Sequence, residues 1–528
     1  MIDREAVRSN AKYLHQVRPI DPDEICEYIE GQPHPAVVRQ TLREEAFDLD
    51  LVEREDGAFV PIEDGPVPHR EWAPDALPQR YSRALEDLLV ERYGANWHRG
   101  DSGAELRTAI REFKANYLDR EPVAYDDTTA VGYAIYHLPA YYAAVGYVLS
   151  TLTERGLLPR TLRVLDVGAG AGGPALGLHD FLFGGDGDGE EGDDTDDSDD
   201  GDNSIDELAA SVDYHAVEPS AAADVLDRLL DETTRNFRST IHRTTIEEFD
   251  YDSVVGADSD DSNAGADSDD SGAGDPADSD TGDAGGFDLI LFGNVLNELD
   301  EPEGVLDTAL DHLAPDGSVV ALAPADRNTA TGLREIERAV ADDSDEVTVY
   351  APTLRLWPDE TPSDRGWSFD VRPDLDMPAF QQRLAEGHED GEADVEPDAY
   401  HNTDVQFAYS VLRRDGERRY PFQASRDRHA RMAAMDDHVT ERIDLLAVKL
   451  SHDLSDDGNP LFRIGDGSQS TDHYAVLTKE SGLNRDLAAA PYGAVLAFEN
   501  VLALWNDDEA AYNLVVDAET VVDALSGS

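Results

Sequence analysis

The 528-residue sequence predicts an α/β protein with a parallel, Rossmann-like central sheet, a helical N-terminal module and a small C-terminal β domain. Two observations predict the sheet. Residues 161 to about 350 alternate apolar strands with helical patterns, and the first of these strands runs into a glycine-rich turn that opens a helix. Length supports the division into parts, because single hydrophobic cores stop growing beyond ~250–300 residues.

The composition is strongly acidic. The formal net charge is −72, yet 40% of the residues are hydrophobic, as in chains that fold. Scarce lysine beside arginine, with aspartate as the main acid, resembles the proteins of extreme halophiles. Molar salt shortens the Debye length to about 3 Å and weakens the repulsion between such charges. We therefore interpret the charge as an adaptation to solvent and not as the mark of a basic partner.

Several kinds of site are excluded by what the sequence lacks. Its one cysteine, Cys26, allows no intramolecular disulfide, no cysteine-rich zinc site and no multi-cysteine iron–sulfur cluster. No H-E-x-x-H or comparable histidine spacing occurs, so no metal is expected. No apolar run approaches the ~20 residues of a membrane span. We expect a soluble, cytoplasmic protein with no membrane partner.

Residues 1–68 predict a winged-helix-like module. Its three helices are expected at about 3–16, 21–30 and 35–46. A hairpin should follow, turning at Asp56-Gly57. Docking of nucleic acid through the third helix and packing against protein both remain open, because the cations Arg39 and Arg43 are offset by two adjacent glutamates.

Residues 72–160 predict a helical lead-in to the sheet. It ends in the aromatic stretch Tyr133–Tyr142, in which Pro139 is expected to break the helix, and a helix at Ala143–Arg155. The aromatic rings could close over a ligand or could form the apolar face of a helix.

The glycine turn is the strongest feature of the sequence. Strand Leu162–Val167 is followed at once by Gly168, Gly170 and Gly172, and then by a helix at Pro174–Phe183. Glycines allow the backbone to turn sharply and to approach a bound nucleoside, while the helix that follows offers free N–H groups. Together with Asp166 before them, these glycines predict a cofactor-binding loop.

A second strand places a carboxylate near this turn. It ends at Glu218, where an acid can accept both ribose hydroxyls of an adenosine ligand. A dinucleotide cofactor is the rival interpretation. The acid that precedes the glycines, Asp166, is typical of methyltransferases and not of the nicotinamide fingerprint, so S-adenosylmethionine is the expected cofactor.

The strand Phe287–Phe292 leads into a loop that contains Asn294 and Asn297. In an open parallel sheet this loop lies at the ligand crevice. The two amides are expected to face the methionine part of the cofactor or the methyl acceptor, with helix capping as the alternative.

The α/β domain is expected over residues 161–420, interrupted by two inserts at 184–203 and 256–286. Both inserts consist almost wholly of Asp, Gly, Ser and Ala and predict disordered loops. A small β domain, with an oligonucleotide-binding barrel as one candidate, is expected over 440–520. Its five strands are predicted at Asp444–Ser451, Tyr474–Glu480, Gly493–Glu499, Val501–Trp505 and Tyr512–Asp517. The aromatics Tyr474, Tyr492 and Trp505 could bind single strands or belong to the core.

The order of several motifs resembles one family. These motifs are Tyr133–Tyr142, Leu165–Gly173, Ala216-Val-Glu-Pro-Ser220, Asn294–Leu299, Pro315-Asp-Gly, Ala323-Pro and Gly332-Leu-Arg-Glu-Ile. Over residues 105–420 the chain is similar to the methyltransferase-like proteins associated with the mitochondrial small ribosomal subunit and their prokaryotic relatives. The resemblance implies an S-adenosylmethionine-type fold that acts on or near small-subunit ribosomal RNA in ribosome assembly or translation, with the small subunit or its RNA as partner.

The sequence departs from this family at one place. Several members hold an iron–sulfur cluster through cysteines in an Ala-Pro-Cys and a Trp-Cys segment, where this chain has Ala351-Pro-Thr353 and Trp367-Ser368. No cluster is expected here. Packing of Trp357, Trp367 and Phe369 is expected to hold the segment instead.

Three functions remain open: a methyltransferase on ribosomal RNA, a non-catalytic assembly factor that keeps the fold, and a methyltransferase on a small molecule or protein. The lone thiol of Cys26 lies far in sequence from the glycine turn, which argues against a cysteine nucleophile. No catalytic residue is assigned from the sequence.

Overall fold

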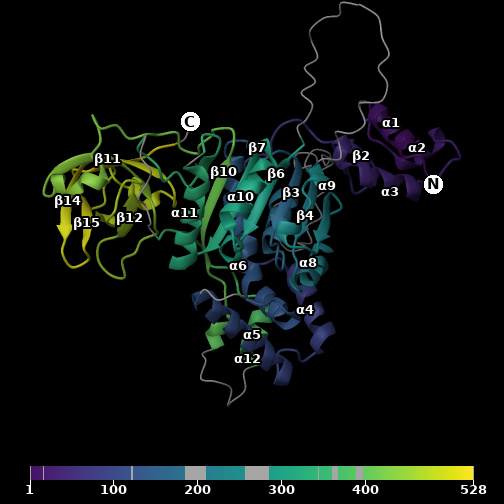
Figure 1. Ribbon diagram of the computed structural model, residues 1–528, viewed down its shortest axis with the longest axis horizontal. Coiled ribbons are helices and arrows are strands. Elements are labelled where there is room, and N and C mark those ends of the chain that lie inside the picture. Colours follow the sequence, from purple (N-terminus) through teal and green to yellow (C-terminus); the bar gives the residue numbers. More distant parts are fainter. Residues whose placement is uncertain are drawn as a thin grey trace, which may run out of the picture.

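The computed structural model describes residues 2–15, 17–119, 123–184, 210–255, 285–342, 344–358, 367–387 and 397–526. Figure 1 shows a central sheet with the barrel at one side, the N-terminal module at the other and a group of helices below. The predicted disordered inserts lie outside the described residues, apart from the edges Gly184, Gly285 and Gly286.

The N-terminal module has three helices and a two-stranded antiparallel hairpin, as predicted. Its elements are α1 (Arg4–Leu14), α2 (Pro22–Tyr28), α3 (Pro35–Glu45), β1 (Leu51–Glu53) and β2 (Phe59–Pro61). Helix α3 packs against β1 and against the central domain. Arg43 pairs with Glu53 through two hydrogen bonds of 2.5 and 2.7 Å, and Arg238 of the central domain donates to the Glu44 carbonyl. These contacts favour the packing interpretation of α3 over nucleic-acid docking.

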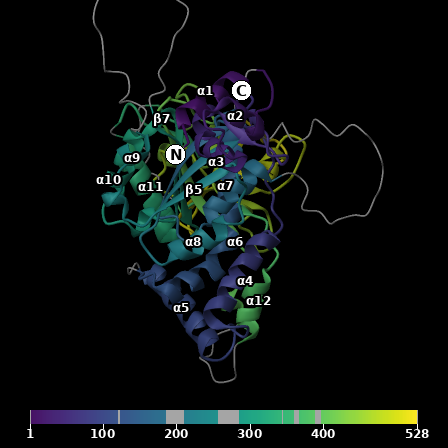
Figure 2. The ribbon, with the colours of Figure 1, turned by 90° about the vertical axis from the view of Figure 1, so that its right-hand side faces the viewer.

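Three helices and a short one from later in the chain form the group below the sheet: α4 (Gln79–Tyr93), α5 (Gly100–Asp119), α6 (Asp127–Thr153) and α12 (Ala379–Glu386). Figure 2 shows α4, α5 and α12 at the same end of the molecule. Helix α6 runs without interruption past Pro139, so the predicted break is wrong. Proline removes the N–H that would bond to the Ile135 carbonyl, and the buried Gln381 side chain of α12 donates to that carbonyl instead, at 2.8 Å.

The central sheet has the strand order β5-β4-β3-β6-β7-β10-β8, with β9 paired to β10. The strands are β3 (Thr161–Val167), β4 (Ser211–Val217), β5 (Phe237–His242), β6 (Phe287–Gly293), β7 (Leu313–Pro324), β8 (Thr348–Ala351), β9 (Asp370–Arg372) and β10 (Val405–Arg413). The first five strands in that order are parallel, and β10 is antiparallel to its neighbours. From β3 the chain first adds β4 and β5 on one side of the sheet and then returns to add β6 and β7 on the other side. In open sheets, ligands bind at such a switch point, here between β3 and β6.

Both faces of this sheet are buried. Leu289 and Leu291 of β6 join the core on the side of α6, while Ile290 and Phe292 join the core on the other side. Helices α7 (Gly173–Phe183) and α8 (Ala222–Leu230) belong to the first layer, and α10 (Pro302–Asp311) and α11 (Arg327–Ala341) to the second. A short helix, α9 (Asp252–Val255), also packs near the second core. Double coverage explains why these strands are apolar runs in the sequence and not alternating ones.

The C-terminal domain is a closed barrel of five strands with a sixth at its edge. The strands follow the order β11-β12-β13-β15-β14, β11 pairs with β14 to close the ring, and β13 runs parallel to β15. The elements are β11 (Arg442–Lys449), β12 (Leu461–Gly465), β13 (His473–Leu477), α13 (Asp486–Ala489), β14 (Val495–Asn506), β15 (Ala511–Val516) and β16 (Val521–Ala524).

The predicted strands of this domain need correction. The two predicted at 493–499 and 501–505 are one bent strand, β14, which continues through Asn500 with a positive φ of 60°. Strand β14 is long because it pairs with β11, β15 and β16 at once. The prediction missed the short strands β12 and β16, which lie next to polar loops; β12 is mostly buried and β16 is half-exposed.

The segment after β8 connects the barrel to the sheet. Trp357 donates its indole N–H to Asp466 of the barrel at 2.7 Å, and Leu354 and Leu356 pack with the barrel residues Val448 and Val495. The Trp367 and Phe369 rings lie 5.4 Å apart, so the expected packing of these two aromatics is confirmed. No helix in the described part of the chain is both long and apolar enough to cross a membrane.

Candidate cofactor and acceptor pocket

The glycine turn joins β3 to α7 through three residues with positive φ: Gly168 at 62°, Gly170 at 55° and Gly172 at 88°. A Cβ on Gly168 would lie 2.4 Å from Val295, and one on Gly172 would lie 2.5 Å from Leu226. Glycine is therefore required at both positions by conformation and by space. At Gly170 the nearest side-chain atom is 3.8 Å away, on Tyr133, so the missing side chain leaves open room.

Glu218 follows β4 and holds this turn in place. Its carboxylate accepts the backbone N–H of Gly170 at 2.8 Å and that of Ser220 at 2.9 Å, and the residue is 6% exposed. Each oxygen keeps a further lone pair for a ligand hydroxyl. The acid and the glycine turn, predicted separately from the sequence, thus form one structural unit.

Asn294 follows β6 and has a positive φ of 68°, an uncommon conformation that asparagine tolerates better than most residues. It is 3% exposed, and its amide Nδ2 is buried with no hydrogen-bond partner among the described residues. Strained backbone and an unsatisfied buried donor often occur together at ligand sites.

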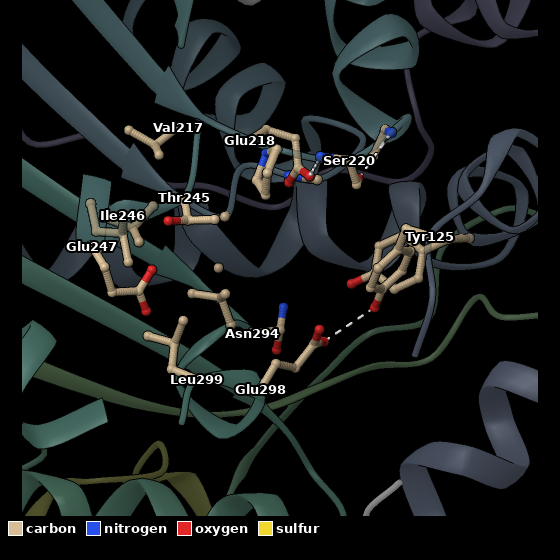
Figure 3. A pocket seen from close by; sticks show the side chains of 18 of the residues that line it. Tyr125, Val217, Glu218, Ser220, Thr245, Ile246, Glu247, Asn294, Glu298 and Leu299 are labelled. Carbon is tan, nitrogen blue, oxygen red and sulfur yellow. Dashed lines mark hydrogen bonds between the residues drawn. The ribbon is translucent and has the colours of Figure 1, made fainter. Parts of the chain in front are cut away.

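These parts enclose a pocket of about 390 Å³ at the carboxyl ends of β3, β4 and β6. Figure 3 shows Glu218 on one wall, Asn294 and Glu298 opposite it, Thr245, Ile246 and Glu247 at one end and Tyr125 at the other. The lining also includes Tyr133, Val167, Val217, Pro219, Ala222, Gly293, Val295, Leu299 and Asp300. The volume falls in the range of small-molecule and cofactor sites.

Four of the seven predicted cofactor residues line this pocket: Gly168, Gly170, Glu218 and Asn294. The other three lie behind it. The Asp166 side chain is fully buried and accepts the Tyr214 hydroxyl at 2.6 Å. Gly172 packs against Leu226, and Asn297 lies against Gly332 of α11. Their place in the structure is that of supports for the turn and the loop, and direct contact with a cofactor stays a prediction.

One end of the pocket is lined by Tyr125, Tyr133 and Glu298. Tyr133 belongs to the aromatic stretch that could close over a ligand, whereas Tyr125 and Glu298 were not assigned from the sequence. Tyr117 and Tyr125 both donate a hydroxyl hydrogen bond to Oε1 of Glu298, the second at 3.2 Å. Tyr133, His137 and Tyr141 line one face of α6 at a spacing of four residues, with ring centroids 4.7 and 4.9 Å apart in succession. That spacing was visible in the sequence, but the partner Glu298 lies more than 150 residues away.

Burial changes the acidity of several groups here. It raises the pKa of the Asp166 carboxyl to about 7, and it lowers the pKa of His137 to about 3 with help from Lys114. Burial also raises the pKa of Glu298, partly offset by the hydrogen bonds from Tyr117 and Tyr125. Within the described ranges, no group of three or more His, Cys, Asp or Glu side chains could hold a metal ion.

Three family models match the sequence. One described as a methyltransferase domain covers residues 141–369. Two others are the N-terminal and C-terminal domains of a domain of unknown function (DUF8157), over residues 4–55 and 433–525. No curated protein matches the sequence.

Several solved structures are similar to 60–67% of this chain. One is the plantazolicin methyltransferase BpumL in complex with SAH, at 11% identity over 63% of this chain and 98% of that one, with a TM-score of 0.26. The cyclase SpnF has 15% identity over 67% and 99%, with a TM-score of 0.27. An O-methyltransferase family protein from Burkholderia thailandensis has 14% identity over 60% and 74%, with a TM-score of 0.24. At such TM-scores these likenesses carry no argument.

The strand order and the family model identify the fold of the central domain. Apart from the short β9, the parallel strands in chain order are β3, β4, β5, β6, β7 and β8. The last strand of the sheet, β10, is antiparallel and inserts between β7 and β8, the fifth and sixth of these. This insertion is characteristic of the methyltransferase fold. The central domain of this protein has the S-adenosylmethionine-dependent methyltransferase fold.

Proposed function

We propose that the protein binds S-adenosylmethionine in the pocket between β4 and β6 and transfers its methyl group to an acceptor. The observation that carries the proposal is the unit of Gly170 and Glu218, which combines a glycine turn, a helix N-terminus and an acid at a strand end. Glu218 would hold the ribose hydroxyls, and the unsatisfied Nδ2 of Asn294 would donate to the methionine part.

Bound S-adenosylmethionine supplies an activated methyl group, so the protein needs chiefly to hold the acceptor in line with it. Positioning of this kind can lower a barrier by ~7–11 kcal/mol.

Calorimetric titration of S-adenosylmethionine into the full chain in molar potassium chloride tests this proposal. Micromolar binding is expected, with a loss of at least tenfold in Glu218→Ala. Glu248→Ala removes an exposed carboxylate outside the lining and should bind as the wild type does. No binding by the folded wild type would reject the pocket as a cofactor site.

A ribosomal partner, implied by the family resemblance, is a second proposal. The C-terminal barrel supports it, because a closed ring of five strands with a parallel β13–β15 pair is the arrangement of oligonucleotide-binding barrels. Of the barrel aromatics, Trp505 is 40% exposed, whereas Tyr492 is buried against Tyr409 of the central domain.

Co-sedimentation with small ribosomal subunits tests the partner. Trp505→Ala should weaken pelleting severalfold, since base stacking on one aromatic contributes ~1–3 kcal/mol. Leu483→Ala, which removes another exposed apolar side chain of the same domain, should not. Tritium transfer from S-adenosylmethionine to the pelleted subunits would separate an enzyme from a non-catalytic assembly factor that keeps the fold.

A further inference from the structure

The end of the pocket beside α6 is an enclosure of tyrosine rings beside the solvent-exposed carboxylate of Glu298. The rings of Tyr125 and Tyr133 meet edge to face with centroids 5.3 Å apart, and the hydroxyls of Tyr117 and Tyr125 lie 3.3 Å apart. Behind Tyr133, the Nδ1 of His137 is buried and has no hydrogen-bond partner in the described part of the chain. Such a cluster of polar groups is unusual for a region that serves only as core.

The two oxygens of Glu298 are unequal. Oε1 accepts both tyrosine hydroxyls, whereas Oε2 accepts no hydrogen bond from any described residue. Figure 3 shows this carboxylate directed toward Tyr125 from the wall that carries Asn294. Two donors fix the carboxylate in one orientation and leave the second oxygen available to an N–H group of a ligand.

The charge of the pocket limits what the ligand can be. Its described lining contains four carboxylates, those of Glu218, Glu247, Glu298 and Asp300, and neither lysine nor arginine. Such a site attracts cations and repels phosphate groups. Aromatic rings beside a carboxylate are also the usual means by which proteins hold an ammonium group.

We propose that this end of the pocket receives the methyl acceptor as a basic amine, with Oε2 of Glu298 accepting its N–H and the rings of Tyr125 and Tyr133 beside its charge. The inference rests on the proposed methyl transfer and names its acceptor class. It holds whether the amine belongs to a small molecule or to a protein side chain.

The chemistry assigns Glu298 a defined task. An ammonium group has no lone pair, so it must first give a proton to Oε2. The amine lone pair then forms the N–C bond to the methyl carbon, while the C–S bond breaks and leaves its electron pair on sulfur. Ammonium and sulfonium thus yield a methylated ammonium, a neutral thioether and one proton, which Glu298 passes to solvent. The surrounding protein atoms raise the pKa of the Glu298 carboxyl, which makes it a better base for this step, and its solvent-exposed side chain can pass the proton to water.

Binding of simple probes to the full chain saturated with S-adenosylhomocysteine tests the proposal. Propylammonium should bind more tightly than phenol or adenosine 5′-monophosphate, as measured by saturation-transfer NMR. Glu298→Gln should weaken propylammonium at least tenfold and leave the affinity for S-adenosylhomocysteine unchanged. Glu303→Gln, an exposed carboxylate on α10 outside the lining, should change neither.

A second variant keeps the carboxylate and changes only its support. Tyr125→Phe removes a hydrogen bond that stabilises the charged form of Glu298 and so raises the pKa of its carboxyl. As the pH is lowered, propylammonium binding should therefore be lost at a higher pH in the variant than in the wild type. An unchanged pH profile would contradict a role for the Glu298 anion.

Tighter binding of phenol or the nucleotide, or full retention of propylammonium by Glu298→Gln, would overturn the amine assignment while leaving the cofactor proposal intact. Failure of the wild type to bind S-adenosylhomocysteine would instead reject the cofactor proposal, and the acceptor inference with it.

Discussion

Single residues divide the pocket into two halves with different chemistry. Glu218 and the glycine turn form a rigid half, in which a carboxylate and backbone N–H groups already satisfy one another. Asn294 and Glu298 form the other half, with one donor and one acceptor that have no partner among the described residues. The first half suits the constant part of a cofactor, and the second suits the groups that react.

Gly170→Val should abolish binding of S-adenosylmethionine, because the added methyl groups would enter the open room beside Tyr133. Valine also disfavours the positive φ of this position. Gly416→Val is the matched control, since Gly416 has a φ of 81° and no atom within 4 Å of an added Cβ. Calorimetry should show lost binding in the first variant and normal binding in the second; equal affinity in both would mean that the site lies elsewhere.

The raised pKa of the Asp166 carboxyl predicts that the stability of the fold depends on pH. Its pKa is raised from 3.8 to about 7, so the folded state favours the protonated form, and this contribution is present below pH ~4 and lost as the pH rises through about 7. Asp166→Asn keeps an acceptor for Tyr214 but cannot ionise. Urea unfolding from pH 4 to 8 should show the wild type losing stability relative to the variant; a constant difference would contradict the raised pKa.

At the scale of elements, α6 is the part that links the pocket to the helices below the sheet. One face carries Tyr133, which lines the pocket, followed by His137 and Tyr141, while Pro139 lies within the same turns. The helix tolerates this proline because a side chain from α12, distant in sequence, supplies the missing donor.

Gln381→Ala should therefore destabilise the fold by about 1–3 kcal/mol, the cost of leaving the buried Ile135 carbonyl unsatisfied. The neighbouring Gln382 is exposed, and among the described residues its side chain bonds only to Glu386, so Gln382→Ala should change stability by less than ~0.5 kcal/mol. Denaturant titration of both variants checks the contrast. Similar losses in the two would show that α6 does not depend on this hydrogen bond.

At the scale of the whole molecule, the net charge of −72 dominates the solution behaviour. Repulsion between so many carboxylates opposes the compact state in dilute buffer, and the Debye length falls from about 10 Å at 0.1 M salt to about 3 Å at 1 M.

The melting temperature should therefore rise markedly between about 0.1 M and 2 M potassium chloride. Differential scanning fluorimetry over this range measures it. Sodium chloride should give the same curve, because screening does not depend on the cation. A melting temperature that is unchanged or falls would contradict a folded state limited by charge repulsion.

The sequence by itself determined the parallel part of the central sheet, the glycine turn and Glu218, but not the antiparallel strand β10. These follow from local rules, since apolar runs make buried strands and only glycine suits the backbone of the turn. The same local rules placed the three helices of the N-terminal module within a few residues.

Only the tertiary structure decided the continuity of α6 through Pro139, the single bent strand β14 and the tyrosine enclosure around Glu298. Each depends on a partner distant in the chain: Gln381 for the helix, three neighbouring strands for β14, and Tyr117 and Tyr125 for the carboxylate. Local pattern indicates what a segment can form, but a hydrogen bond from a remote side chain changes which form is lowest in free energy, and that bond exists only once the chain has folded.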